Sequence, residues 1–535
     1  MFGSIIRIQG KKCSCLGPHF YKIISNILYI CIYIYIIQIN HIRCISAISI
    51  SVFPSLVATV PPNSAVALEA AFCGGNSAKA TAGINFLKNQ DDSETHFRDD
   101  TLHAGQTNGE LASLLCRNSS SDMNWLIDRF DLDFAVVSKL SCHARARTYR
   151  TKDSIPGMAL TYALIQMVEK VAEVSDRARL VTKAEVFQLL LRDGKVVGCE
   201  YKKSGRSSKE YGPVVLCTGG FGGRSGVESV LVKHRPDLAH CPTSNCEQCS
   251  GDGLKLGAQA GARTIDLEWV HLHPTGLVNE DDPDAQRKVL AGECFRQAGG
   301  LLLNADGNRF CNESGPTEHI LAEMQKNSGP FRLCLNTAAT RELHWQCRTF
   351  ISRKLMKCYA SGTDLAKDMK IPLQKLIDVH DAHAEAFRNS LKRGNEQGPW
   401  PGTNGRTSWD ECSGTRGCGK CDFRNVLVGS RVAEEPFHVA IVTPVILYCA
   451  GGIQINSHAE VVDEHGKGIL GLYAAGESTG GIHGKQALSG NLLLDCLVFG
   501  RLAAKSACRY IFGEDDEFRP CPLQTFGASK NDGPA

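Results

Sequence analysis

The stretch from residue 468 to 512 combines a glutamate, paired glycines and a helix start at a spacing that could hold a flavin. "GILGLYAAGE" indicates a buried strand ending at Gly476-Glu477, and "GNLLLDCLVFGRLAAKSACRYIF" has the spacing of an apolar helix capped by Ser489 or Asn491. Such a glutamate can accept hydrogen bonds from a ribityl hydroxyl, and a helix amino terminus can stabilise the negative charge of a reduced isoalloxazine ring. A generic turn between a strand and a helix has the same pattern, so this stretch alone leaves both interpretations open.

The elements that must position these residues follow a mixed α/β pattern from about residue 63 onward. "SAVALE" and "GPVVLCTGG" are apolar runs that stop at an acid or at paired glycines, as buried strands of a parallel sheet do. "VTKAEVFQLLLRDGKVVGCEY" predicts two strands joined by a turn at Asp193-Gly194. "LIDVHDAHAEAFRNSLKRG" predicts a helix, and the section from Gly394 to Cys421 predicts a loop.

Composition and charge narrow the classes of function. The 535 residues are 43% hydrophobic and 21% charged, which is ordinary for a soluble globular protein, and a net charge of +3 gives no reason to expect nucleic acid as a partner. The 24 cysteines are scattered, with two CxxC pairs, Cys246–Cys249 and Cys418–Cys421, and with Cys412 near the second pair. Zinc would need both pairs at finger-like spacing, and they lie far apart, so no metal site is predicted.

Residues 1–62 form an atypical, isoleucine-rich amino-terminal segment that contains "ILYICIYIYII". The run from Ile23 to Ile39 is just short of the roughly 20 apolar residues that a membrane helix needs, and Asn26 and Gln38 weaken it. It is either a membrane anchor or an artefact of the gene model, because alternating Tyr-Ile is what a translated TAT-ATA repeat gives. In both cases we expect residues 1–62 to pack poorly or not at all.

Six motifs follow one another in order: "FCGGNSAKATAGIN", "VVLCTGGFGG", "SGDGLKLGAQAGARTIDLEWVHLHPTG", "AGECFRQAGGLLLNADGNRFCNE", "CAGGIQINSHAEVVDEHGKGILGLYAAGESTGGIHG" and "SGNLLLDCLVFGRLA". Together they resemble the FAD-dependent oxidoreductase 2 family, in particular soluble fumarate reductases of the succinate dehydrogenase/fumarate reductase flavoprotein superfamily. The resemblance implies an α/β fold with a Rossmann-like FAD-binding domain in two segments, residues 63–265 and 448–513. An α+β capping domain, residues 266–447, is inserted between them, and residues 514–535 form a tail.

The resemblance also implies where the FAD would be contacted. The residues that match are Glu69, Gly74, Gly75, Asn76, Gly83, Ala184, Val186, Gly219, Gly220, Asp252, Glu477, Asn491 and Leu493. Asn76 occupies the position where membrane-bound relatives carry a flavin-linking histidine, so the FAD is expected to be non-covalent.

One part of the family pattern is missing. Family members begin with a strand and a G-x-G-x-x-G loop about thirty residues before the acid that matches Glu69. Here no glycine lies between Pro18 and Cys73. Because the backbone must approach a pyrophosphate closely at a helix start, Ile, Val and Pro cannot replace those glycines. We therefore expect the chain to bind FAD weakly or not at all.

For the reaction, the resemblance implies reduction of fumarate to succinate by hydride transfer from the flavin. His273, with Thr275 nearby, matches a histidine that helps to bind the dicarboxylate substrate, and Glu293 and Arg296 match a pair that relays protons.

Three other positions depart from the family. In the family, the position of Thr317 holds an arginine that acts as the general acid. The position of Leu447 holds a histidine, and that of Ala487 holds a second arginine. None of the three can supply the charge or the proton, so we expect fumarate reduction far below that of a complete family member. Lys485 and His483 lie close to Ala487 in sequence and are the first residues to consider as replacements.

Three hypotheses follow. The chain is a fumarate reductase-type FAD enzyme, a catalytically impaired relic of one, or the product of a wrong gene model. The electron donor and the oligomeric state cannot be derived from the sequence. The resemblance implies a cytoplasmic or mitochondrial location, with membrane attachment if residues 23–39 are a genuine segment.

Overall fold

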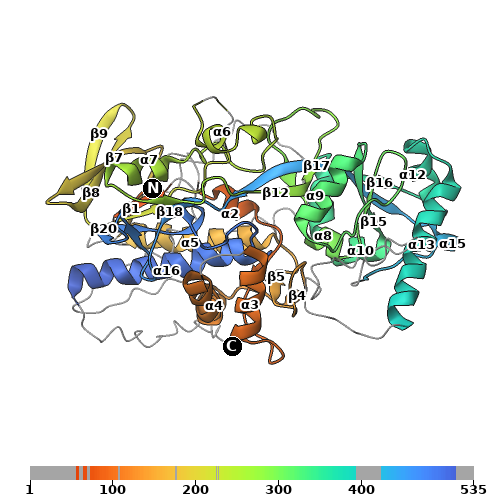
Figure 1. The fold of residues 1–535 in the computed structure, drawn as a ribbon, viewed down its shortest axis with the longest axis horizontal. Helices are drawn as coiled ribbons and strands as arrows, with labels where there is room; N and C mark the ends of the chain where they lie inside the picture. The colour runs from red at the N-terminus through yellow and green to blue at the C-terminus, as the bar shows by residue number, and fades with distance from the viewer. Residues whose placement is uncertain are drawn as a thin grey trace, which may run out of the picture. The chain divides into compact units, whose positions relative to one another are not determined.

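The computed structural model describes residues 56–59, 64–68, 73–105, 109–174, 178–223, 226, 228–392 and 423–513, all within one compact unit (Figure 1). The isoleucine-rich run, Glu69, the second CxxC pair with Cys412 and the tail from residue 514 lie outside these ranges. Within them, no helix is long and apolar enough to cross a membrane. The same ranges contain no group of His, Cys, Asp and Glu side chains placed to hold a metal ion.

The central six-stranded sheet is assembled from distant parts of the chain. Its strands, in spatial order, are β19 (Glu460–Val462), β20 (Gly468–Ala474), β10 (Val214–Cys217), β1 (Leu56–Thr59), β2 (Ser64–Leu68) and β6 (Ala178–Thr182). β10 is parallel to β20, β2 is parallel to β6, and β1 is antiparallel to both β10 and β2. Four strands therefore share one direction, and their carboxyl ends lie at one edge of the sheet. The prediction of buried parallel strands in "VVLCTGG" and "GILGLYAAGE" is confirmed.

The strand β1 differs from the expectation for the amino-terminal segment. Leu56 pairs with Cys217 and Leu68 at the carboxyl edge, and the strand then runs away from that edge to Thr59. Only the four positions 60–63 separate β1 from β2, so the two strands form a hairpin without a crossover helix. The expectation that residues 1–62 pack poorly is therefore wrong for 56–59. An extended segment there satisfies the backbone N–H and C=O groups that β10 and β2 would otherwise leave unpaired.

Long helices pack beside this sheet (Figure 1). α16 (Asn491–Phe512) contacts β20 and α4 (Gly109–Phe130), and α5 (Pro156–Val174) contacts β6 and α2 (Gly75–Lys79). The predicted helix α16 is confirmed, but its N-cap is Gly490 rather than Ser489 or Asn491. Gly490 has φ 91°, and a Cβ there would lie 2.3 Å from the side-chain oxygen of Asn85, so the close approach of β3 (Ile84–Asn85) requires glycine.

A three-stranded antiparallel sheet lies next to β20. It consists of β7 (Glu185–Arg192), β8 (Lys195–Lys203) and β9 (Arg206–Tyr211). The predicted turn between β7 and β8 is confirmed at Asp193-Gly194, and both residues have the positive φ that a two-residue type I′ turn needs.

A second large sheet is formed by residues 270–449. In order it contains β13 (Val289–Leu290), β12 (Val270–Leu277), β17 (Phe437–Cys449), β15 (Phe331–Asn336) and β14 (Leu301–Leu303), and β16 (Lys357–Tyr359) also pairs with β17. Its helices are α8 (Cys294–Gln297), α9 (Thr317–Lys326), α10 (Thr337–Glu342), α11 (His344–Ser352), α12 (Gly362–Asp368), α13 (Leu373–Lys392) and α15 (Gly429–Val432). The helix predicted from "LIDVHDAHAEAFRNSLKRG" is confirmed as α13. Separate apolar clusters fill this part, so it has its own core.

The remaining elements are short. Two small sheets contain β3, β5 (Thr148–Arg150) and β4 (Val136–Ser138), and β11 (Thr264–Ile265), β18 (Gly452–Gln454) and β21 (Thr479–Gly480). The other helices are α3 (Glu94–Gly105), α6 (Val230–His234), η2 (Pro236–Leu238), α7 (Asp252–Gln259) and η3 (Gly476–Ser478).

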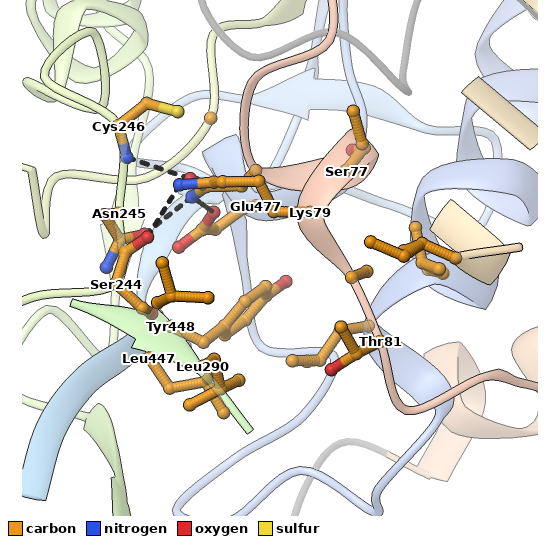
Figure 2. Close-up of a pocket in the computed structure, with 18 of the residues that line it drawn as sticks. Ser77, Lys79, Thr81, Ser244, Asn245, Cys246, Leu290, Leu447, Tyr448 and Glu477 are labelled. Atoms are coloured by element: carbon orange, nitrogen blue, oxygen red, sulfur yellow. Dashed lines mark hydrogen bonds between the residues drawn. The ribbon is translucent and has the colours of Figure 1, made fainter. Parts of the chain in front are cut away.

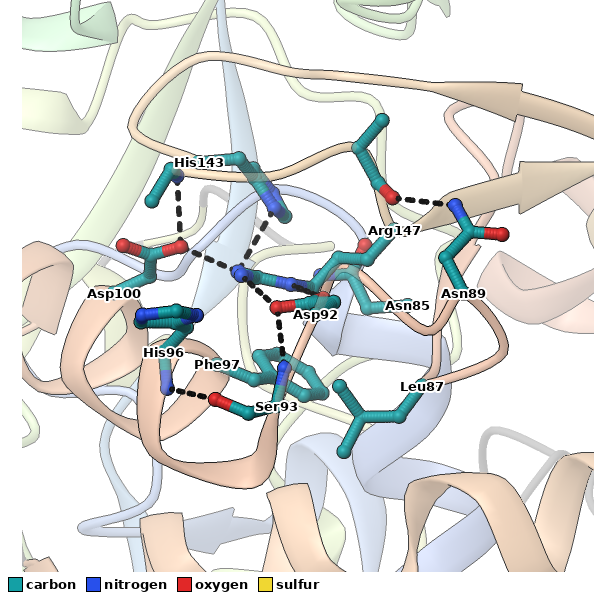
Figure 3. A network of polar contacts seen from close by, with 12 residues as sticks. Asn85, Leu87, Asn89, Asp92, Ser93, His96, Phe97, Asp100, His143 and Arg147 are labelled. Atoms are coloured by element: carbon teal, nitrogen blue, oxygen red, sulfur yellow. Dashed lines mark hydrogen bonds and ion pairs between the residues drawn. The ribbon is translucent and has the colours of Figure 1, made fainter. Parts of the chain in front are cut away.

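A buried ion cluster lies around Arg147 (Figure 3) and contacts the loop that precedes α16. The guanidinium, 1% exposed, donates to both carboxylate oxygens of Asp92 at 2.6 and 2.9 Å and to Asp100 at 2.5 Å. His143, beside Arg147, has its Nε2 atom 2.9 Å from the carbonyl oxygen of Ser489. The cluster thus connects α3 to the residues that begin α16.

Candidate functional site

A cavity of about 560 Å³ lies at the carboxyl ends of β10 and β20 (Figure 2). Its walls come from α2, the ends of β10, β17 and β20, the first turns of α16, the segments 244–248 and 287–290, and the end of α11. This volume is in the usual range of ligand sites, and the position at strand ends is where open α/β sheets bind ligands. The cavity is therefore the candidate functional site.

Glu477 is the buried acid of this cavity. It follows β20 directly, in η3, and its carboxylate accepts from the backbone N–H of Cys449 at 3.1 Å and the side-chain amide of Asn76 at 3.2 Å. Burial raises the pKa of the Glu477 carboxyl to about 7, although these hydrogen bonds oppose the rise. Gly220 makes room for it, since a Cβ on that residue would lie 2.6 Å from the carboxylate.

Asn76 connects three separate segments around the cavity, namely α2, residues 245–249 and the end of β20. Its side-chain nitrogen donates to Asn245 Oδ1 at 2.6 Å and to Glu477, and it lies 3.3 Å from Cys249 Sγ. Its side-chain oxygen accepts from the backbone N–H of Cys246 at 2.9 Å. The side chain therefore holds the 245–249 segment against the end of β20.

The cavity lining carries more cations than acids. The basic lining residues are Lys79, Arg287, Lys288 and Arg353, and the acidic ones are Glu247 and Glu477. Arg287 pairs with Glu247 at 3.2 Å, and Lys79 donates to the Ser244 carbonyl at 2.7 Å. Burial lowers the pKa of the Lys288 ammonium, whose Nζ donates to the Pro283 carbonyl. This excess of positive charge favours an anionic ligand.

Behind the cavity wall lies a chain of three buried polar side chains. The hydroxyl of Tyr448 donates to Asp495 Oδ2 at 2.9 Å, and His483 Nε2 lies 3.1 Å from the same oxygen. Tyr448 also lines the cavity and stacks on His271, and burial with the Asp495 charge raises the pKa of its phenol. His483 is thus engaged with Asp495, whereas Lys485 is exposed and bonds to Gly105 through its backbone N–H.

The residues expected to contact FAD are brought together only in part. Those that line the cavity are Asn76, Gly219, Glu477 and Leu493, with Gly220 directly against Glu477; those elsewhere are Gly74, Gly75, Gly83, Ala184, Val186, Asp252 and Asn491. Asn491 accepts from the Asn85 amide at 2.8 Å, and Asp252 pairs with Lys255 at 3.0 Å.

The three residues expected to act on substrate are buried, and none of them lines this cavity. His273, on β12, has its Nδ1 atom 3.1 Å from the hydroxyl of Thr275, and burial together with Arg296 holds the pKa of its imidazole well below 6.5. Glu293 accepts from the Ser489 hydroxyl, from the Ser141 N–H at 2.5 Å and from Gln297 at 3.3 Å.

Arg296, one turn after Glu293, is completely buried. Its Nη1 donates to the Glu313 carbonyl at 2.9 Å, and its Nε and Nη2 atoms have no hydrogen-bond partner among the described residues. These two donors are free for an anionic group.

The three substituted positions lie in different surroundings. Thr317 is the buried first residue of α9, Leu447 on β17 lines the cavity, and Ala487 is half-buried in the loop before α16. An apolar side chain therefore faces the cavity where the resemblance calls for a histidine.

The sequence reasoning missed Tyr448, Asp495 and Asn245. A sequence signal existed for Asp495, because an aspartate in the otherwise apolar run "NLLLDCLVF" needs a buried partner. Nothing in the sequence pairs Asn76 with Asn245, which lie 169 positions apart.

Known proteins resemble this chain in sequence over most of its length. A family model described as "FAD binding domain" matches residues 58–493. A fumarate reductase of Schizosaccharomyces pombe is 34% identical over 449 residues, with 81% of this chain and 82% of the relative covered. Fumarate reductase 1 of Saccharomyces cerevisiae is 30% identical over 462 residues, with 82% and 92% covered.

Among solved structures, the open conformation of a flavocytochrome c3 fumarate reductase superposes with a TM-score of 0.60. It is 23% identical, and the match covers 83% of this chain and 74% of that chain. At this identity the likeness concerns the fold.

Proposed function

This chain belongs to the FAD-binding-domain family and is an FAD-dependent oxidoreductase of the fumarate reductase type, and we propose that its substrate is a small dicarboxylate such as fumarate. The observation that carries the proposal is the cavity at the carboxyl ends of β10 and β20, where buried Glu477 lies beside Asn76 in a lining with more basic than acidic residues. The buried Glu477 carboxylate can accept hydrogen bonds from the hydroxyl groups of a cofactor chain, and the basic residues of the lining can bind a dianion.

We propose that the two sheets correspond to two domains. The central sheet takes strands from both ends of the described chain, and the second sheet lies between them in sequence. This supports a Rossmann-like FAD-binding domain in two segments, residues 63–265 and 448–513, with a capping domain of residues 266–447. β1 extends the first segment to residue 56.

The residues around Glu477 fit the flavin and ribityl parts of FAD. The Glu477 carboxylate would accept from ribityl hydroxyls, and the missing Cβ of Gly220 keeps that carboxylate reachable. Asn76 has a side-chain amide, which supports a non-covalent cofactor. When bound, FAD supplies the hydride for the alkene carbon.

The residues present fit the pyrophosphate part of FAD less well than the flavin part. The hairpin of β1 and β2 leaves four positions where the family has a glycine loop and a helix amino terminus. Without those N–H groups the diphosphate charge loses its main partners in a Rossmann fold. We propose that FAD is bound weakly, far below stoichiometric retention.

The substrate residues that remain form half of a site. His273 and Arg296 would bind a carboxylate, with Nε and Nη2 of Arg296 as the donors, and Glu293 would pass a proton through its hydrogen bond with the Ser489 hydroxyl. Thr317, Leu447 and Ala487 supply neither charge nor proton. Loss of a general acid alone costs roughly two to four powers of ten in rate. Fumarate turnover should therefore be far below that of complete relatives, which is also what a catalytically impaired relic would show.

Two measurements test the proposal. Purified protein passed through a gel-filtration column should retain much less than one flavin per chain in its visible absorption spectrum. With FAD added, fumarate reduction from a reduced dye should be slow for the wild-type chain. It should recover in the triple variant Thr317→Arg, Leu447→His and Ala487→Arg, and only slightly in each single variant, because such residues act as a unit.

A matched control is Leu290→His, which adds a histidine to the cavity at a position outside the family pattern. It should not raise turnover. Fast turnover by the unmodified chain would show that other residues have replaced the three lost groups, and His483 and Lys485 would be examined first. Stoichiometric flavin after gel filtration would refute the weak binding.

A further inference from the structure

A pair of thiols sits in the cavity wall with no role in the proposed function. Cys246 lines the cavity and is partly exposed, whereas Cys249 is fully buried. The backbone N–H of Cys249 donates to the Cys246 carbonyl at 3.0 Å, which closes a β-turn over Glu247 and Gln248. The α-carbons at the two ends of such a turn lie within about 7 Å, and a disulfide needs roughly 4.4–6.8 Å. The backbone is therefore already close to the geometry of a disulfide.

The turn is held firmly on both sides. On one side, the Gly223 N–H donates to the Cys249 carbonyl at 2.9 Å, and a Cβ on Gly223 would lie 1.9 Å from the Cys246 oxygen. On the other side, Asn76 accepts from the Cys246 N–H at 2.9 Å, and its amide lies 3.3 Å from Cys249 Sγ. Fixing both thiols in one turn removes most of the entropy cost of joining them.

The two thiols differ in access and in chemistry. A small molecule in the cavity can reach Cys246. Burial, with the nearby Glu477 carboxylate, holds the pKa of the Cys249 thiol well above its usual value. This asymmetry is typical of a dithiol with one exposed attacking sulfur and one buried resolving sulfur.

We propose that Cys246 and Cys249 form a redox-active dithiol that is oxidised by a low-molecular-weight disulfide of the glutathione type entering the cavity. This inference goes beyond the proposed function and does not depend on bound FAD. It also differs from a metal site, because the described residues contain no group of three or more His, Cys, Asp or Glu side chains placed to hold a metal ion.

The chemistry balances in two exchange steps. The Cys246 thiol releases its proton to water, and its sulfur attacks the small disulfide, forming a mixed disulfide and releasing one small thiolate, which is then protonated. Cys249 then loses its proton, and its sulfur attacks Cys246 Sγ, which forms the Cys246–Cys249 bond and releases the second small thiol. Two protein thiols are oxidised, and one small disulfide is reduced to two thiols.

The experiment uses the full chain, reduced and desalted, in buffers of graded ratio of reduced to oxidised glutathione. Remaining thiols are alkylated under denaturing conditions, and peptides are analysed by mass spectrometry. We expect Cys246 and Cys249 to escape alkylation together. The mass of their peptide should be about 2 Da below that of the same peptide with both thiols reduced and unalkylated, because disulfide formation removes two hydrogens. Dithiothreitol should restore both thiols.

Two single variants separate the roles. Cys249→Ser should trap one glutathionyl group on Cys246, and Cys246→Ser should leave Cys249 reduced at every ratio. Cys358 is the matched control, because it is exposed and has no cysteine three residues away. It should form at most a mixed disulfide.

The proposal is overturned if the wild-type pair stays reduced at ratios that modify Cys358, or if Cys246 pairs with another cysteine. These results come from the wild-type chain, so they hold even if a variant folds poorly. Because glutathione exchange is read without fumarate or FAD, failure here is distinct from failure of the proposed function.

Discussion

Replacement of Glu477 by Gln should stabilise the flavin-free protein at neutral and higher pH. The Glu477 carboxyl has its pKa raised by burial from 4.5 to about 7. Between those values the folded state binds a proton that the unfolded state has released, so the free energy of unfolding falls as pH rises from about 4.5 to about 7. At about 1.4 kcal/mol per pH unit, the interval from 4.5 to about 7 corresponds to a loss on the order of 3 kcal/mol. Glu477→Gln carries no charge and avoids this loss.

The variant has a second, pH-independent effect. The glutamine oxygen can still accept from the Cys449 N–H, but its amide cannot accept from Asn76, and a lost hydrogen bond costs about 1 kcal/mol. Only the change with pH is therefore diagnostic. Urea unfolding followed by tryptophan fluorescence should give a stability difference that grows by on the order of 3 kcal/mol between about pH 5 and pH 8.

The matched control is Glu464→Gln, an exposed glutamate in the turn between β19 and β20. Its stability difference should stay constant over the same range. If the Glu477→Gln and wild-type curves run parallel from pH 5 to pH 8, the reasoning from burial is refuted. Bound FAD would add its own binding free energy, so flavin must be removed first.

Two further predictions concern packing. Arg147→Met leaves the carboxylates of Asp92 and Asp100 without their cation and should lower the free energy of unfolding by roughly 3–5 kcal/mol in urea titrations. The control Arg98→Ala, at an exposed ion pair, should change that free energy by less than about 1 kcal/mol. Equal effects of the two would contradict the burial of the cluster. Gly220→Ala places a methyl group 2.6 Å from the Glu477 carboxylate and should weaken FAD binding in fluorescence titrations, whereas Gly226→Ala, with no atom of the described residues within 4 Å of its Cβ position, should leave it unchanged. Unchanged FAD affinity in Gly220→Ala would argue against contact through Glu477.

The local signals in the sequence were sufficient for many elements. Apolar runs that end in glycine predicted β10 and β20, Asp193-Gly194 predicted the hairpin of β7 and β8, and the apolar spacing predicted α16. These features depend on neighbours a few positions apart, so periodicity and turn chemistry determine them. The position of Glu477 at the end of a strand is predictable for the same reason.

The family motifs predicted more than the local patterns did, because they also indicate the family and the cofactor. They identified the FAD-binding family that the chain belongs to and the cofactor. They did not predict that Leu56–Thr59 would pair between β10 and β2, since the motif expected at that place is absent and one of the two partners, β10, is far away in sequence. Nor could they predict Gly490 as the N-cap of α16, which follows from the close approach of Asn85.

Side-chain contacts between distant segments were decided by the tertiary structure alone. Asn76 meets Asn245 and Glu477, Tyr448 and His483 meet on Asp495, and the CxxC turn faces the cavity. Each buried polar group must find a partner once water is excluded, and which partner it finds depends on how the two sheets and α16 pack. The sequence determined which chemical groups were present and where strands such as β10 and β20 ended; only the packing, by removing water from between segments far apart in the chain, decided which of those groups act together.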